Sequence, residues 1–306
     1  MGEELDELNR LFTSKNVVDV IKFYDHFENT KQLIEWMRNR PSAPMKIYEV
    51  EGDKDIVIVI PTADHNGKLA QNCINSMFNG QQIIFVESNG PFFNYARSCN
   101  FGLKYALKYN PKWIILSNDD VIKVDHFSKL KNALSYIDCE STDVVYIKHP
   151  NSRSPPLWIA KGNSLLKFIR LILGKKYRNY THIANRFSIK YYIVGEARLL
   201  RGRGLLYKRL YKFLNFGDFG IFSNKFISLK SKFFDETYIN GYEDIELSLE
   251  ISSKYNTKTK FVDFILESIG GGTLGRDKSR NFREVAGLCY IQEVLFAYIK
   301  NTKDIK

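Results

Sequence analysis

The chain has 306 residues, of which 44% are hydrophobic, so it can bury a full core in one large domain or two small ones. Its four cysteines (Cys73, Cys99, Cys139 and Cys289) lack a Cys-x-x-Cys pair or a histidine at ligand spacing, which excludes a disulfide framework and a zinc finger. No apolar run approaches the roughly eighteen residues of a membrane span, and the acidic N-terminus is unlike a signal peptide. We therefore expect a cytoplasmic protein, peripheral at most on the cytoplasmic face of a membrane.

Positive charge is concentrated in one segment. The formal net charge is +11, and residues 161–212 hold fourteen lysines and arginines against the single acid Glu196. The rest of the chain is therefore slightly acidic. Such a segment predicts a surface for phosphate-rich partners.

Residues 1–45 have the spacing of amphipathic helices, and Pro41 and Pro44 end that unit. From residue 56 onward, hydrophobic runs alternate with helical patterns. Alternation of this kind predicts βαβ units, and hence an α/β fold with a parallel sheet. The expected strands are residues 56–60, 83–86, 113–116, 144–147 and 260–265, and the expected helices are residues 69–78, 94–109, 124–137 and about 242–255.

Two adjacent carboxylates follow one of these strands. Residues 113–116 are continuously apolar, as in a parallel strand covered on both faces, and they lead into Asn118, Asp119 and Asp120. Open α/β sheets bind their ligands at this carboxyl edge. Because hard oxygen ligands suit Mg²⁺ or Mn²⁺, the pair predicts a divalent ion that bridges a diphosphate. The alternative is a solvated turn in which Asp120 caps the next helix.

Five motifs in sequence order, between residues 55 and about 275, resemble glycosyltransferase family 2, the nucleotide-sugar-dependent enzymes with the GT-A fold. The resemblance implies a GT-A (Rossmann-like), mostly parallel sheet flanked by helices. The motifs are the strand ending in Pro61-Thr62, the strand ending in Glu87, Ala96-Arg97-Ser-Cys-Asn100-Phe-Gly102, Asn118-Asp119-Asp120, and Phe234-Asp235-Glu236 followed by Glu243-Asp244. By resemblance, the residues that bind the nucleotide sugar are Pro61, Thr62, Glu87, Arg97, Asn100, Asn118 and Asp119.

Two positions depart from the family pattern. The family's Asp-x-Asp motif begins here with Asn118, which suits the ribose and leaves Asp120 as the direct metal ligand. The family's last motif often reads His-x-Gly-Gly-Gly-Thr, and Ser268 stands here at the position of the histidine, with Glu267 beside it. We expect Asp120 to hold Mn²⁺ or Mg²⁺, with Glu267 or Ser268 nearby.

The chemistry that this resemblance implies is inverting glycosyl transfer. A metal at Asp120 would neutralise the charge of the departing diphosphate, and Arg97 would add a charge-assisted contact to the same diphosphate. Glu87 would accept a hydrogen bond from the base or ribose of the nucleotide. Asp244 would be the base for the acceptor hydroxyl, with Glu243 contacting the acceptor. Plainer alternatives are an exposed turn acid at Glu87, a surface arginine at Arg97, and carboxylates at Glu243 and Asp244 that complement a helix dipole.

The glycine-rich residues 270–275 lack the Lys-Ser/Thr of a phosphate-binding loop and follow a late strand. We expect them to form a flexible loop that closes over the donor and brings Arg276 and Lys278 near the diphosphate; a plain turn is the alternative. The five histidines show no paired spacing, so none is assigned to a metal.

The basic segment has more than one interpretation. Residues 165–176 and 199–214 combine an apolar face with cations, as do helices that lie on anionic membranes, and a lipid-linked saccharide would then be a fitting acceptor. The alternative is a helical insertion that packs on the domain. Nucleic acid has no supporting motif.

The sequence thus predicts a helical extension (1–50), a GT-A domain (51–275) with a basic helical insertion at about 157–215, and a helical tail (276–306). The predicted function is transfer of a sugar from a nucleotide-diphosphate sugar to a saccharide or lipid-linked acceptor. Sugar-1-phosphate nucleotidyl transfer is an alternative. That reaction would require a basic glycine-rich loop directly after the first strand, and residues 61–67 do not supply one. The other alternative is a catalytically silent module that binds membrane or nucleic acid through residues 161–212.

Overall fold

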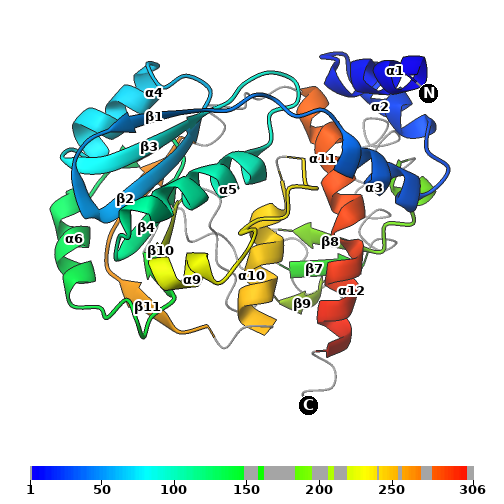
Figure 1. The fold of residues 1–306 in the computed structure, drawn as a ribbon. Helices are drawn as coiled ribbons and strands as arrows, with labels where there is room; N and C mark the ends of the chain where they lie inside the picture. The colour runs from blue at the N-terminus through cyan, green and yellow to red at the C-terminus, as the bar shows by residue number, and fades with distance from the viewer. Residues whose placement is uncertain are drawn as a thin grey trace.

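A computed structural model describes residues 2–147, 158–161, 183–194, 206–209, 219–239, 241–253, 257–269 and 278–301. Its centre is a seven-stranded sheet of order β1-β3-β2-β4-β10-β6-β11 (Figure 1). Five of these strands run in one direction, while β1 and β10 run antiparallel to their neighbours. The prediction of an α/β fold with a mostly parallel sheet is confirmed. The strands are β1 (Lys46–Val50), β2 (Asp53–Thr62), β3 (Gln81–Glu87), β4 (Trp113–Ser117), β6 (Val144–Ile147), β10 (Phe219–Ser223) and β11 (Thr259–Val262).

Helices cover both faces of this sheet, because its strands are apolar on both sides. Along β2, Ile56, Ile58 and Ile60 join one buried cluster, while Val57 and Val59 join the other, as the two-residue period of a strand requires. The first cluster is completed by α4 (Lys68–Asn72), its π-helical continuation (Cys73–Met77) and α6 (Phe127–Ser135); the second by α5 (Tyr95–Ala106), α9 (Asn224–Ser228) and α10 (Glu243–Ser253).

Helix α5 lies especially close to the sheet. A Cβ built on Gly102 would stand 2.5 Å from Val59 Cγ1 and 2.7 Å from Val86 Cγ2, so a glycine is needed where the helix crosses β2 and β3. The helix begins where Asn94 accepts a hydrogen bond from the Arg97 backbone N–H. A 3₁₀ turn (Leu107–Tyr109) follows α5 and ends at Asn110, whose φ of 47° is left-handed. The helix predicted at 94–109 is therefore present.

The two ends of the chain share one further core. Helices α1 (Gly2–Thr13), α2 (Val17–Asp25) and α3 (Thr30–Asn39) pack with α11 (Lys278–Tyr290) and α12 (Gln292–Asn301) (Figure 1). The Tyr24 hydroxyl donates to the carbonyl of Phe282 at 2.5 Å, which ties α2 to α11. The helices expected in residues 1–45 and after 276 are present. Strand β1, however, falls before the expected boundary at residue 50 and belongs to the central sheet through its pairing with β3.

The described part of the basic segment is a small sheet. Strands β7 (Trp158–Lys161), β8 (Tyr191–Val194) and β9 (Leu206–Arg209) form an antiparallel sheet of order β8-β7-β9, with one helical turn at 183–186. The expectation of a helical insertion at about 157–215 was wrong at 158–161, 191–194 and 206–209, because these residues pair with one another as antiparallel strands. The helix expected at 165–176 lies outside the described residues. Among the helices that are described, none is both long and apolar enough to cross a membrane.

Candidate active site at the carboxyl edge of the sheet

The side chains predicted from three strand ends meet at one edge of the sheet. In the register, Thr62 at the end of β2 pairs with Glu87 at the end of β3, and Val59 of β2 pairs with Leu116 of β4. That alignment brings Asp119, just past β4, level with Thr62. The Thr62 hydroxyl donates to Asp119 Oδ2 at 2.7 Å. Strand β2 extends beyond the expected residues 56–60, and Pro61 and Thr62 are its last two residues.

The two adjacent aspartates are buried, with Asp119 4% and Asp120 3% exposed. Cys73 lies beneath them, since its thiol donates to the carbonyl oxygen of Asp119 at 3.4 Å. Burial, reinforced by the charges of the two aspartates, raises the pKa of Cys73 to about 12. The alternative in which Asp120 caps the next helix is wrong, because α6 is capped by His126. These carboxylates are therefore shielded from open solvent.

A short two-stranded sheet brings Ser268 to Asp120. Strands β5 (Val121–Lys123) and β12 (Leu266–Ser268) pair antiparallel, with Ser268 opposite Val121. The Ser268 hydroxyl is 3.5 Å from Asp120 Oδ1, and the backbone N–H of Ile269 donates to the Asp120 carbonyl at 3.1 Å. Glu267 is exposed, as strand alternation requires of the neighbour of Ser268. Of the two expected neighbours of Asp120, Ser268 is the one in contact.

Glu87 has an unforeseen partner in His65. The His65 backbone N–H and ring Nδ1 lie 3.0 and 2.6 Å from Glu87 Oε2, and these hydrogen bonds lower the pKa of Glu87. The imidazole stacks on Tyr48 with centroids 3.5 Å apart and the planes at 8°. Ligand atoms of Asp64, His65 and Glu87 lie within 4.8 Å of one another, so the three could also hold a metal ion. No sequence pattern indicated this contact, because His65 comes near Glu87 only through the pairing of Thr62 with Glu87 in the sheet.

Asn118 connects this edge to α5. The Tyr95 hydroxyl, in the first turn of α5, donates to Asn118 Oδ1 at 3.0 Å. One turn further along, Cys99 lies near Glu243: burial raises the pKa of the Cys99 thiol, and the charge of Glu243 contributes to that rise. Asn118 and Glu243 thus both lie near the N-terminal half of α5.

The two acids predicted to act on the acceptor, Glu243 and Asp244, begin α10. Glu243 is 6% exposed and accepts a hydrogen bond from the Gly241 backbone N–H at 2.7 Å. Burial, with a further contribution from the charge of Asp244, raises the pKa of Glu243 to about 8. Asp244 is less buried. The negative charge of Asp244 thus favours the protonated form of Glu243.

Two residues assigned to the nucleotide have other contacts. Asn100 donates to the Phe234 carbonyl and to Glu236 Oε1 at 2.8 and 3.0 Å, and its Oδ1 accepts from the N–H groups of Phe233 and Phe234 at 3.1 and 2.8 Å. These four bonds use the full hydrogen-bonding capacity of the Asn100 side chain. Asn100 therefore binds the 233–236 loop and has no donor or acceptor left for a nucleotide. Arg97 lines a separate pocket whose walls include neither Thr62 nor Glu87 nor residues 118–120.

The expected glycine-rich loop at 270–275, with Arg276, lies outside the described residues, and Lys278 is the first residue of α11. Comparison of the chain with protein-family models and with curated proteins finds no match. The function must therefore be inferred from the chemistry of the site: two buried carboxylates at a sheet edge, an oriented carboxylate on the neighbouring strand, and two adjacent acids at the start of α10.

Proposed function

We propose that this protein is a glycosyltransferase with a GT-A fold, similar to family 2. It moves a sugar from a nucleotide-diphosphate sugar to a saccharide or lipid-linked acceptor. The observation that carries the proposal is the contact of Thr62 with Asp119, which holds the Asn118–Asp120 motif at the carboxyl edge of the sheet beside Glu87. That edge is where open α/β sheets bind nucleotides.

The residues at this edge suit the two ends of such a donor. Asp120 and Asp119 are hard, buried oxygen ligands, and the Ser268 hydroxyl adds a neutral oxygen 3.5 Å from Asp120. These would hold Mn²⁺ or Mg²⁺, which when bound supplies neutralisation of the departing diphosphate. Glu87, kept ionised and oriented by His65, accepts a hydrogen bond from the base or ribose of the donor.

Asp244 is the base of the proposed reaction. The raised pKa of Glu243 keeps that carboxyl protonated at neutral pH, so it is the poorer base, and Asp244 is the more accessible of the two. It removes the proton of the acceptor hydroxyl as that oxygen attacks the anomeric carbon, the bond to the diphosphate breaks, and the configuration inverts. The neutral Glu243 carboxyl leaves no second negative charge beside the attacking oxygen.

A thermal-shift panel of UDP, GDP, dTDP and CMP, each with and without Mn²⁺, tests the donor site. We expect one nucleotide to raise the melting temperature, Mn²⁺ to enlarge the rise, and Asp120→Asn to abolish the enlargement. Asp263→Asn is the matched control, because Asp263 is exposed on a neighbouring segment. His65→Ala separates the two metal positions: a Mn²⁺ response that survives in Asp120→Asn but is lost in His65→Ala would assign the metal to Asp64, His65 and Glu87. A flat panel would contradict the proposal and favour the silent binding module.

A further inference from the structure

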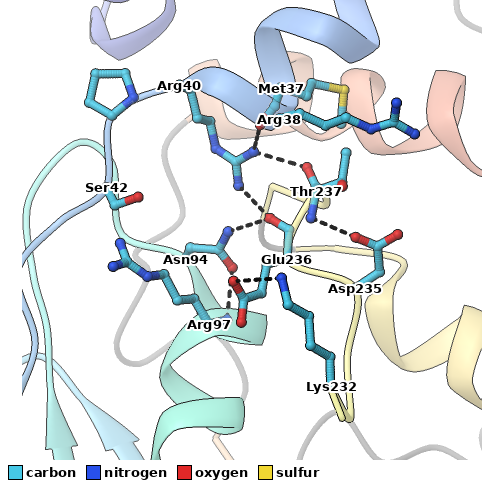
Figure 2. Close-up of a pocket in the computed structure, with 11 residues that line it drawn as sticks. Met37, Arg38, Arg40, Ser42, Asn94, Arg97, Lys232, Asp235, Glu236 and Thr237 are labelled. Carbon is cyan, nitrogen blue, oxygen red and sulfur yellow. Dashed lines mark hydrogen bonds and ion pairs between the residues drawn. The ribbon is translucent and has the colours of Figure 1, made fainter.

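A pocket of about 490 Å³ borders the first turn of α5. Figure 2 draws its walls, which come from the end of α3, the first turn of α5 and the segment 232–237. Its charged lining residues are Arg38, Arg40, Arg97 and Lys232 against Asp235 and Glu236, which leaves two positive charges in excess. The volume lies within the range of small-molecule sites, about 300–1,000 Å³.

Arg97 has a donor that nothing in the described structure satisfies. Its Nη1 atom is buried and makes no hydrogen bond. A buried guanidinium nitrogen without an acceptor is costly, because it has lost water and gained no partner. Nη1 itself is shielded from solvent, so an anion in the pocket would bind the remainder of this guanidinium, which makes no hydrogen bond or ion pair with the described residues.

None of the other charged side chains that line the pocket accepts a hydrogen bond from Arg97 Nη1. Arg40 directs both of its Nη atoms at backbone carbonyls, those of Met37, Glu236, Thr237 and Tyr238, so no carboxylate is its direct partner. Burial lowers its pKa to about 10, which leaves it cationic at neutral pH.

The two acids are already engaged. Asp235 accepts from the Thr237 N–H at 2.8 Å and from the Tyr290 hydroxyl at 2.6 Å. Glu236 Oε1 accepts from Asn100 at 3.0 Å, and its Oε2 lies 3.6 Å from Lys232 Nζ. Both acids thus already have hydrogen-bond or ion-pair partners, and the cationic side chains of the lining outnumber them by two.

We propose that this pocket binds the phosphate group of a small phosphorylated molecule, with Arg97 as the principal donor. Arginine offers a planar pair of N–H groups that matches phosphate oxygens, and a dianion matches the two excess charges. Asn94 lines the pocket too, and it caps α5 so that the positive end of the helix faces the same space. The inference is independent of the proposed function, because none of the residues proposed to hold the metal (Asp119, Asp120 and Ser268) lines this pocket.

Isothermal titration with inorganic phosphate and with glucose 1-phosphate tests this pocket, with glucose as the uncharged comparison. We expect both phosphates to bind, glucose not to bind, and Arg97→Gln to weaken phosphate binding at least tenfold. Arg10→Gln is the matched control, because Arg10 is an exposed arginine of α1 outside the pocket. The Asp120→Asn variant should bind phosphate as the wild type does, which separates this site from the donor site.

Thermal unfolding without ligand distinguishes a binding role from a structural one. Since Nη1 has no partner, Arg97→Gln should leave the melting temperature unchanged or raise it, while the rise that phosphate causes in the wild type should vanish. Phosphate binding that is unaltered in Arg97→Gln, or equally weakened in Arg10→Gln, would overturn the proposal and assign the affinity to positive charge elsewhere. No binding by the wild type would overturn it outright.

Discussion

The buried carboxyl of Glu243 should make the protein less stable as the pH rises. Below pH 4.5 the group is protonated in both the folded and the unfolded chain and contributes no pH dependence. Between pH 4.5 and about 8 the folded chain keeps the proton while the unfolded chain releases it. The unfolded state therefore binds fewer protons, and the free energy of unfolding falls with pH across this window.

The size of the effect follows from the pKa values. Each pH unit of difference corresponds to about 1.4 kcal/mol, so a folded pKa of about 8 against an ordinary value of 4.5 corresponds to a loss of about 5 kcal/mol by pH 8. Glu243→Gln replaces the protonated carboxyl by a neutral isostere that still accepts from the Gly241 N–H. Its advantage over the wild type should be near zero at pH 4.5 and grow to several kcal/mol by pH 8.5.

Urea unfolding followed by tryptophan fluorescence at pH 5, 7 and 8.5 measures this difference. Glu35→Gln, an exposed position in the middle of α3, controls for the removal of a carboxylate as such. Asp244→Asn removes the second cause of the raised pKa and should flatten the wild-type slope in part. Parallel stability curves for Glu243→Gln and the wild type would refute the reasoning, because they would mean that Glu243 ionises in the folded chain as it does in water.

Three other substitutions test the packing of the site. Thr62→Val removes a donor from buried Asp119 and should cost about 2 kcal/mol in urea unfolding, whereas Thr62→Ser should cost little; equal losses would contradict the hydrogen bond. Asn100→Ala should cost about 3 kcal/mol or more by the same assay, because four hydrogen bonds to the 233–236 loop are lost together; a loss below 1 kcal/mol would point instead to a ligand-binding role. Gly102→Ala should cost about 1–3 kcal/mol by overpacking, and Val59→Ala in the same chain should restore part of it; no restoration would mean that the strain lies elsewhere.

The sequence by itself predicted the elements that carry the site. Apolar runs at 56–60, 83–86 and 113–116 became β2, β3 and β4, because a continuous hydrophobic run can be buried on both faces of a sheet wherever its neighbours come from. The polar residues that follow such runs then had to lie at one edge. The resemblance had grouped Thr62, Glu87 and Asp119, and their positions at the ends of neighbouring strands explain why the structure brings them together.

Hydrophobic patterns along the sequence could not predict contacts between segments that are far apart in the chain. Strand β10 fits antiparallel between β4 and β6 although about a hundred residues separate it from β4, and β1 joins the sheet edge from within the expected helical extension. His65 was left unassigned because ligand spacing was sought along the sequence, whereas its partner Glu87 comes from the neighbouring strand.

Arg97 and Asn100 mark the limit most clearly. Their motif was recognised correctly as part of a helix, and the helix is present, but the direction of each side chain depends on what packs against α5. The Asn100 side chain is hydrogen-bonded to the 233–236 loop, and residues at the end of α3 line the same pocket as Arg97. Local sequence determines which residues share a helix face, since that depends only on backbone periodicity. Which surface that face meets is decided by contacts between distant segments, and only the tertiary structure contains them.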